Sequence, residues 1–428
     1  MSNQEIIRRR QYCQFVKEVI GSDEYLLVGI DVAKDNHHAF MGTATGKVLF
    51  KKLVFENNLK GFSRLMETSE AIKTQSGLSK LVYGLEPTGN YHKPLARHLI
   101  RCSRDIVMVT GQAVKSNRKV LDGRWDKNDT KDAANVADLI SRGRCVYYDS
   151  PSKEIEELRS LLSVRRRLKK EEHSLKMRIR NGLLAQYFPE LDQFYSACES
   201  ESLAIIKWCL DPDKIATMEF EQFFKMVTRT TRGIAQKLRL HKVYQAAIDS
   251  VGCPMEQAAE FEAELLVEKL KQVRKQISQT QNLIEEICLE FKEYPYLMTI
   301  PGFGPYVSAK VLASIADPFR FDSCKQVIRL SGFDLCANRS GKTSHKAVPT
   351  ISKNGNGELR WAVYQAAKVA SSRTDSFRVY FAKLLRGRER EQGIITKMRV
   401  KLAVKMLVIA WTLMKRKEAF DPNHLNID

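Results

Sequence analysis

The stretch Leu26-Leu27-Val28-Gly29-Ile30 is strongly apolar and ends in an acid, Asp31. A short run rich in Val, Ile and Leu between polar residues predicts a strand that is buried on both faces of a sheet. An acid at the C-terminal end of such a strand lies at the rim of the sheet, where α/β folds build ligand and metal sites. Asp31 therefore predicts a site at this edge, provided that the rest of the chain supplies partners.

The charge balance indicates what kind of molecule the chain binds. Lys and Arg outnumber Asp and Glu by 70 to 50, which gives a net charge of +20 and a pI near 9.5. Such an excess attracts polyanions over about a Debye length, so nucleic acid is the expected partner. The alternative is a basic but otherwise ordinary soluble protein. The length of 428 residues predicts two or three domains.

Cysteines and hydropathy predict the compartment. The nine cysteines form no C-x-x-C pair, which argues against a disulfide framework and a zinc ribbon. The N-terminus lacks the apolar region of a signal peptide. The most apolar window, residues 402–414, is shorter than the roughly 20 residues needed to span a membrane. We expect a soluble, cytoplasmic protein with no membrane partner.

Hydrophobic periodicity over the first third of the chain predicts an α/β domain. A polar, helical lead-in comes first, and a meander of three strands and an alternation of helices and strands follow. This is the order of a ribonuclease-H-like sheet with helices on its faces. The expected strands are 25–31, 36–44, 47–55, 81–86 and 106–109; the expected helices are 58–74, one opening near 88–90, and 129–142.

The rest of the chain predicts helices. Residues 153–184 form a long basic helical pattern, and a heptad seam interrupted by Thr280 runs from Leu266 to Phe291. We expect the two helices to pair as an antiparallel coiled-coil arm. Residues 190–255 are either a helical insert at its tip or a helical unit that packs only on itself. The predicted domains are a 1–24 extension, an α/β domain at 25–150, the arm at 151–294, a mostly helical domain at 295–418 and a tail at 419–428.

Three further acids could converge with Asp31 at the edge of the sheet. Glu86 ends the second apolar strand run, and Asp129 and Asp132 lie three apart at the start of a helix, on one face. Four clustered carboxylates repel one another strongly unless cations lie between them, and all-oxygen ligation favours Mg²⁺ or Mn²⁺. The set predicts a metal site that acts on phosphodiester oxygens. Each acid alone has a simpler role, as a helix cap, a first-turn acid or a solvated strand end.

The C-terminal third carries two glycine turns and one polar loop. The first turn, with Gly302 and Gly304, precedes a helix that carries Lys310. The backbone N–H groups at the start of this helix suit a phosphate. A tight helix connection without a ligand is the alternative. Lys353 and Arg360 flank the second turn and are expected to contact phosphates. Between the turns, Ser340 lies among the cations Arg339 and Lys342, a setting that suits attack on a phosphate. A solvated loop is the simpler alternative.

These segments, in this order, resemble the DEDD insertion-sequence transposases that include the pilin-gene invertase. The resemblance covers about residues 25–145 and 295–415. The motifs that carry it are Gly29-Ile30-Asp31, Glu86-Pro87-Thr88-Gly89-Asn90-Tyr91, Lys127-x-Asp129-x-x-Asp132-Ala133, Ile300-Pro301-Gly302-x-Gly304-Pro305, Ser340-Gly341-Lys342 and Ile351-Ser352-Lys353-x-Gly355-Asn356. The middle of the chain is longer than is usual for the family, and an extension precedes the first strand.

The resemblance implies roles for named residues. It makes Asp31, Glu86, Asp129 and Asp132 the metal ligands of a RuvC-like domain, and Ser340 the nucleophile that holds a DNA strand as a phosphoserine. Ser344 is a second hydroxyl in the same loop. It also implies a homodimer or tetramer in which the acids of one subunit meet the serine of another, and a structured bridge RNA that pairs with the DNA.

The sequence thus predicts a DNA transposase or recombinase with a serine nucleophile and a divalent metal. Two rivals remain open. One is a metal-dependent nuclease or Holliday-junction resolvase, in which water is the nucleophile. The other is a basic nucleic-acid-binding protein without catalytic activity.

Overall fold

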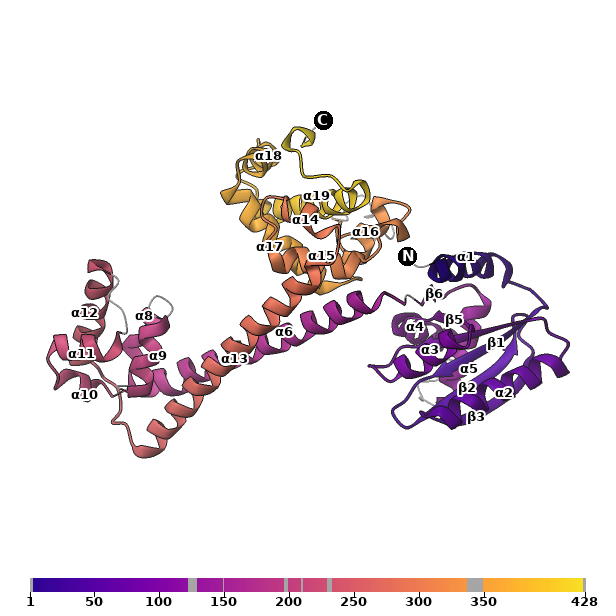
Figure 1. Ribbon diagram of the computed structural model, residues 1–428, viewed down its shortest axis with the longest axis horizontal. Helices are drawn as coiled ribbons and strands as arrows, with labels where there is room; N and C mark the ends of the chain where they lie inside the picture. Colours follow the sequence, from indigo (N-terminus) through magenta and orange to yellow (C-terminus); the bar gives the residue numbers. More distant parts are fainter. Residues whose placement is uncertain are drawn as a thin grey trace, which may run out of the picture. The chain divides into compact units, whose positions relative to one another are not determined.

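The computed structural model describes residues 3–121, 129–148, 150–195, 199–208, 211–228, 233–336 and 349–425. It divides into two compact units, residues 1–150 and residues 151–428, each with its own core (Figure 1). Among the helices that the structure describes, none combines the length and the apolar content needed to cross a bilayer.

A mixed six-stranded sheet forms the centre of the first unit. Its spatial order is β3-β2-β1-β4-β5-β6, in which β1 pairs in parallel with β4 and β4 with β5, while the other pairs are antiparallel. The predicted meander and the later strands are confirmed to within a residue or two at their ends. The strands are β1 (Tyr25–Asp31), β2 (Asn36–Thr43), β3 (Val48–Glu56), β4 (Lys80–Glu86), β5 (Asp105–Met108) and β6 (Val146–Tyr147).

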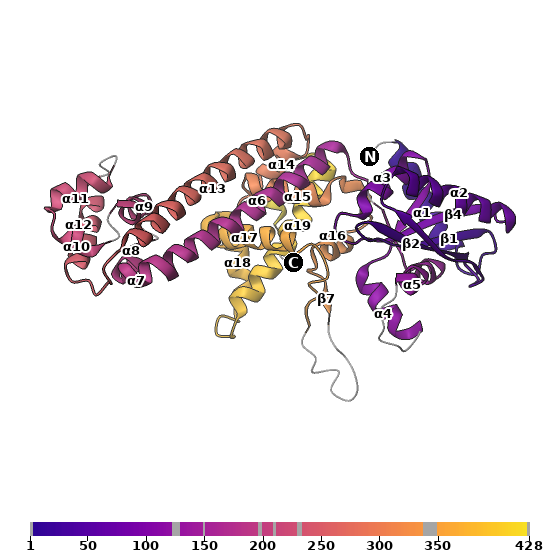
Figure 2. The ribbon, with the colours of Figure 1, turned by 90° about the horizontal axis from the view of Figure 1, so that it is seen from below.

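Helices cover both faces of this sheet. One face packs against α2 (Leu59–Gln75) and α3 (His92–Arg101); the other packs against α1 (Asn3–Glu18), α4 (Gly111–Leu121) and α5 (Asp129–Ser141). Figure 2 shows α3 on one side of the sheet and α4 and α5 on the other. The sequence predicted neither α4 nor β6. Helix α4 buries Val114 and the polar Asn117, so it has no apolar stripe, and β6 is only two residues long.

Two long antiparallel helices form the arm of the second unit. Helix α6 (Lys153–Arg178) continues through a π-helical segment (Ile179–Leu184) and α7 (Ala185–Tyr187), and it packs along α13 (Gln257–Leu289) (Figure 2). The predicted heptad positions are buried or half-buried along the interface. Thr280 is tolerated there because its hydroxyl donates a 2.7 Å hydrogen bond to the carbonyl of Gln276 in its own helix.

The helical insert packs on the end of the arm. Leu183 and Leu266 of the arm share one apolar core with Phe223 and Leu240 of the insert. Of the two alternatives that the sequence left open, the structure thus has the insert joined to the arm. The insert contains α8 (Asp192–Tyr195), α9 (Glu199–Trp208), α10 (Pro212–Ala216), α11 (Phe220–Val227) and α12 (Ile234–Ile248).

The C-terminal part is mostly helical, as predicted, and it shares its core with the base of the arm. Leu158 and Ile284 of the arm pack in the same cluster as Leu312 and Leu402. A short antiparallel hairpin, β7 (Leu335–Cys336) and β8 (Thr350–Ile351), interrupts the helices. The helices are α14 (Tyr294–Met298), α15 (Pro305–Ile315), α16 (Cys324–Ser331), α17 (Gly357–Arg373), α18 (Asp375–Leu385) and α19 (Ile394–Arg416).

Candidate active site

The structure places Asp31 and Glu86 side by side. They end the neighbouring parallel strands β1 and β4 and are register partners. Adjacent strands lie about 4.8 Å apart, so the two Cα atoms are direct neighbours. Both residues are half-buried, whereas the strand residues just before them are buried. The two acids therefore mark the point where an apolar strand pair meets the rim of the sheet.

Two glycines show which way these acids point. Gly29 and Gly84 are also register partners, two residues before the acids. A Cβ atom on Gly29 would lie 2.2 Å from the carbonyl oxygen of Ala133, and one on Gly84 would lie 1.9 Å from Cδ1 of Ile140. Both contacts belong to α5. Because side chains alternate along a strand, Asp31 and Glu86 point to the face that α5 covers.

Asp132 lies on the first turns of α5, next to the residue that contacts Gly29. Its side chain is only 2 % exposed, and its Oδ1 atom forms a 2.5 Å ion pair with Nη2 of Arg118 in α4. A buried carboxylate without such a partner is costly, so Arg118 stabilises the charge of Asp132. Arg118 was not predicted from the sequence, because α4 shows no hydrophobic pattern and the ion pair forms only in the folded unit.

A buried amide network fixes α4 against α5. The side-chain amide of Asn117 donates to Oδ1 of Asn135 at 2.8 Å and to Oδ2 of Asp138 at 2.7 Å, and Asn135 donates to the carbonyl of Val114 at 2.9 Å. Such satisfied networks hold helices in one register. The same helix pair carries Arg118 and Asp132, so the network also sets the geometry of that ion pair.

Glu86 also meets the start of α4. A Cβ atom on Gly111, the first residue of α4, would lie 3.1 Å from Oε1 of Glu86. The N-terminus of a helix carries partial positive charge, which favours a carboxylate there. Strand β4 and the helices α4 and α5 thus converge on one end of the sheet.

The structure describes the side chains of three of the four predicted metal ligands. Asp31 and Glu86 are neighbouring acids at the ends of two paired strands, on one face of the sheet. Asp132 is engaged by Arg118. Within the described ranges, no group of three or more His, Cys, Asp or Glu side chains is placed to hold a metal. The side chain of Asp129, which begins α5, lies outside the described residues.

The predicted nucleophile loop also falls outside the described part. Arg339, Ser340, Lys342 and Ser344 lie within residues 337–348, which the structure does not describe. The two ends of this segment are described. Beside the β7–β8 hairpin, Oγ of Ser352 donates to Oδ1 of Asp334 at 2.6 Å, and the amide of Ser352 donates to the carbonyl of Asp334 at 2.7 Å.

The second glycine turn supports the β7–β8 hairpin, which forms the base of the 337–348 segment. Lys353 is exposed and has φ +57°, and a Cβ atom on Gly355 would lie 2.4 Å from the amide nitrogen of Gly332. Arg360, predicted to contact phosphate, donates from Nη1 to the carbonyl of Ser331 at 2.8 Å. Asn356 caps α17 by accepting hydrogen bonds from the amides of Glu358 and Leu359. Arg360 therefore joins the turn to α16.

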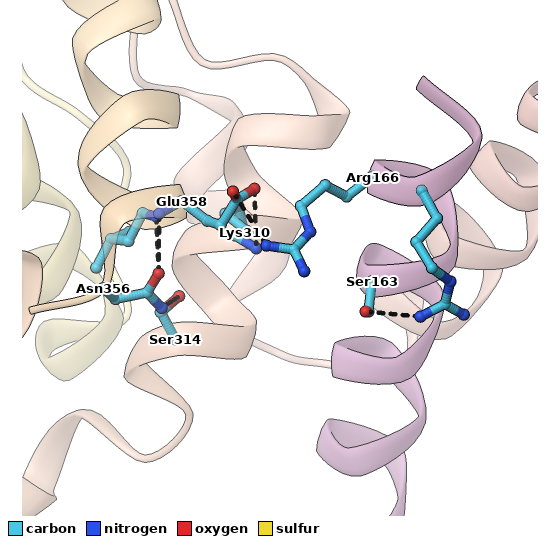
Figure 3. A network of polar contacts seen from close by, with 8 residues as sticks. Ser163, Arg166, Lys310, Ser314, Asn356 and Glu358 are labelled. Carbon is cyan, nitrogen blue, oxygen red and sulfur yellow. Dashed lines mark hydrogen bonds and ion pairs between the residues drawn. The ribbon is translucent and has the colours of Figure 1, made fainter. Parts of the chain in front are cut away.

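The first glycine turn leads into a polar cluster that spans three helices (Figure 3). Gly302 has φ +91°, and its Cα lies close to α17, since a Cβ atom would lie 2.8 Å from the carbonyl oxygen of Ala366. Gly304 caps α15. Lys310 of α15 and Arg166 of α6 lie 4.0 Å and 3.4 Å from the carboxylate of Glu358 in α17. Burial lowers the pKa of Lys310, and Glu358 opposes this shift.

Comparison with known proteins assigns both ends of the chain to transposases. Residues 28–189 match a family model for the DEDD domain of IS110 transposases, described as a transposase, and residues 294–382 match the model described as the transposase IS116/IS110/IS902 family. The first match includes all four predicted acids, and the second includes Ser340.

Curated relatives extend the match over almost the full length. The chain is 22 % identical over 422 residues to the transposase for insertion sequence element IS1111A of Coxiella burnetii, which covers 97 % of this chain and 96 % of the relative. It is 23 % identical over 398 residues to an insertion element IS110 protein of Streptomyces coelicolor, covering 89 % and 93 %. The pilin gene-inverting protein of Moraxella bovis is 30 % identical over 127 residues, covering 29 % of this chain and 38 % of that protein.

Proposed function

The chain carries both domains of the IS110 family of transposases and belongs to that family, and we propose that it cuts and rejoins DNA through Ser340 with help from a divalent metal at the acid end of its sheet. Transposition or inversion of DNA is the activity of the family. The nucleophile, the metal and the guide are the parts proposed here. The single observation that carries the proposal is the pairing of Asp31 with Glu86 on the face covered by α5.

The strand order supports a ribonuclease-H-like assignment for the first unit. An antiparallel meander joined in parallel to β4 and β5 places the ends of β1 and β4 at the centre of the sheet. Asp31 and Glu86 stand at these ends, and Asp129 and Asp132 belong to the first turn of α5, which packs on β1. We propose these four acids as the ligands of Mg²⁺ or Mn²⁺. The metal would neutralise charge on phosphate oxygens.

Ser340 would supply the covalent step. Its Oγ loses its proton and attacks the phosphorus of a phosphodiester. The bond from phosphorus to the leaving sugar oxygen breaks, this oxygen takes up a proton as a free hydroxyl, and the other DNA end is held as a phosphoserine. Arg339 and Lys342 flank Ser340 in the sequence and would offset charge on the transferring phosphoryl group. The ester conserves the energy of the broken bond, so a second strand can reverse the step and join.

We further propose a structured guide RNA and an oligomer. Base pairing with the RNA would select the DNA sites, while exposed cations such as Lys353 would hold the backbone without reading sequence. In a dimer or tetramer, the acids of one subunit would act with the serine of another. A mixture of Ser340→Ala and Asp31→Asn chains tests this arrangement, because complementing subunits would recover recombination that neither variant has alone.

The serine assignment has a direct test with a matched control. The full chain is incubated with a DNA substrate, quenched, digested and analysed by mass spectrometry for a nucleotide-modified peptide. We expect the Ser340→Ala variant to lose the adduct and strand exchange, and the Ser344→Ala variant to retain both. Full DNA cleavage by Ser340→Ala would instead favour the nuclease or resolvase, in which water attacks.

A further inference from the structure

A basic pocket lies between α2 and α3, on the face of the sheet opposite to the acids. It has a volume of about 510 Å³ and opens widely to solvent. Its cationic side is formed by Lys93, Arg97 and Arg101 of α3. Its apolar side includes Leu59 and Phe62 of α2. The strand-end acids point to the other face, so this pocket is separate from the candidate active site.

The three cations follow one ridge of the helix. Residues four apart lie on the same side and rise about 6 Å per step, so each side chain can serve a successive phosphate of an extended strand. All three residues are exposed, and no Asp or Glu is among the described residues that line the pocket. Arg104 and Lys73 of the same unit, by contrast, form ion pairs with Glu70.

This arrangement works against the stability of α3. Like charges four apart destabilise a helix by roughly 0.2–0.5 kcal/mol per pair, and Lys93 lies in the first turn, where the helix dipole disfavours a cation. The helix, His92–Arg101, contains no acid that would offset these charges. Folding alone does not explain a row of cations in a ten-residue helix, whereas a bound polyanion does.

The apolar side indicates that the polyanion has unpaired bases. Leu59 is 66 % exposed although it is a large apolar residue at the first position of α2. Behind it, the ring of Phe62 lies 5.5 Å from the ring of His98, centre to centre. A duplex hides its base faces, whereas a single strand offers them to an apolar wall while its phosphates meet the cations.

We propose that this pocket binds a single-stranded segment of nucleic acid, with phosphates on Lys93, Arg97 and Arg101 and a base or sugar against Leu59. The proposal rests on the proposed function only in taking nucleic acid as the partner. DNA freed during strand exchange and a loop of RNA share the chemistry that the pocket recognises.

The test uses the full chain and single-stranded oligonucleotides that carry iodouracil, in DNA and RNA forms. We expect photo-crosslinks in peptides that contain Leu59, Phe62 or His98. The Lys93→Ala, Arg97→Ala, Arg101→Ala triple variant should lose those crosslinks. In titrations at several salt concentrations, it should also lower the slope of log affinity against log salt by about 2 in magnitude, because each phosphate contact on a single strand contributes about 0.7.

A charge-matched control removes three exposed lysines from the same unit, as Lys47→Ala, Lys51→Ala, Lys52→Ala. It should keep the crosslinks at the pocket. The single changes Arg97→Gln and Leu59→Ala provide the same readout if the triple variant does not fold, and each should reduce the crosslink yield several-fold.

The outcomes distinguish a DNA strand from an RNA strand, and they separate both from results that would overturn the proposal. Crosslinks with only the DNA or only the RNA strand support the site and identify its source. Equal loss in the pocket variant and the control, absence of pocket crosslinks, or displacement of the strand by polyglutamate at equal charge would overturn the proposal. None of these results depends on the Ser340 adduct, so failure here leaves the proposed recombination chemistry standing.

Discussion

The acid end of the N-terminal sheet and the base of the 337–348 segment are held in different ways. At the acid end, two register-paired strands fix Asp31 beside Glu86, and glycine contacts bring α5 onto the same face. At the loop base, Ser352 and Arg360 brace a two-residue hairpin through several hydrogen bonds, and Gly355 packs against Gly332. The first arrangement comes from close packing of regular elements, and the second mainly from polar contacts around a turn.

The difference bears on what each region can do. Packed cores have few alternative arrangements, so the acid end keeps its geometry while a substrate binds. A hydrogen bond contributes only about 1 kcal/mol net, and somewhat more when one partner is charged, so the loop base depends on several such contacts together. The contrast bears on the proposed roles, in which the acids orient phosphate and Ser340 supplies the nucleophile.

The largest expected effect comes from the paired acids. Asp31→Asn and Glu86→Gln keep the side-chain shapes but remove the charge that a cation needs, so we expect recombination to fall by about 100-fold or more. The melting temperature of each variant shows whether the fold is intact. Asp35→Asn, an exposed acid near the same strand, is the matched control. Full activity in both variants would contradict the role of this pair.

Arg118→Gln tests the charge balance at Asp132. Removing one partner of a buried ion pair costs about 3 kcal/mol, because the buried carboxylate is left uncompensated. Added Mn²⁺ should recover part of this loss if a metal can take the place of the guanidinium. The measurement is chemical unfolding with and without Mn²⁺, and Arg142→Gln, whose ion pair with Asp138 is more exposed, is the control. An unchanged midpoint would show that the pair contributes little.

The glycine contacts give a graded comparison. Gly29→Ala would place Cβ against the backbone of Ala133, so we expect a loss of about 3 kcal/mol in the free energy of unfolding. Gly84→Ala meets the tip of Ile140, which can move, and should cost about 1 kcal/mol. Ile140→Val removes that tip. The double variant with Gly84→Ala should therefore lose less free energy of unfolding than the two single variants lose in sum. An equal loss in the free energy of unfolding for Gly29→Ala and Gly84→Ala would contradict the close contact between Gly29 and the backbone of Ala133.

Arg360→Gln has the smallest expected effect and decides between two roles. If Arg360 braces the loop base, hydrogen exchange should quicken at Ser331 and Lys353 and local stability should fall by about 1–2 kcal/mol. Lys353→Gln, at an exposed neighbour, should leave the exchange unchanged. Unchanged exchange together with a smaller salt dependence of DNA binding would assign Arg360 to phosphate instead.

The sequence indicated the strand ends and long helices because their signals are local and repeated. Asp31 and Glu86 were found as acids that end apolar runs, and Gly29 and Gly84, two residues before them, are a signal that could also have been used. Arg118 could not be found, since its partner lies on another helix and α4 has no stripe. Lys310 was expected at a phosphate, but only folding reveals that it faces Glu358.

Electron paramagnetic resonance of Mn²⁺ bound to the full chain, in the presence of uncleaved DNA, tests whether the paired strand ends hold the metal. We expect bound Mn²⁺ in the Ser340→Ala chain and its loss in Ser340→Ala chains that also carry Asp31→Asn or Glu86→Gln. Equal Mn²⁺ binding in all three chains would contradict the proposal that the paired strand ends hold the metal.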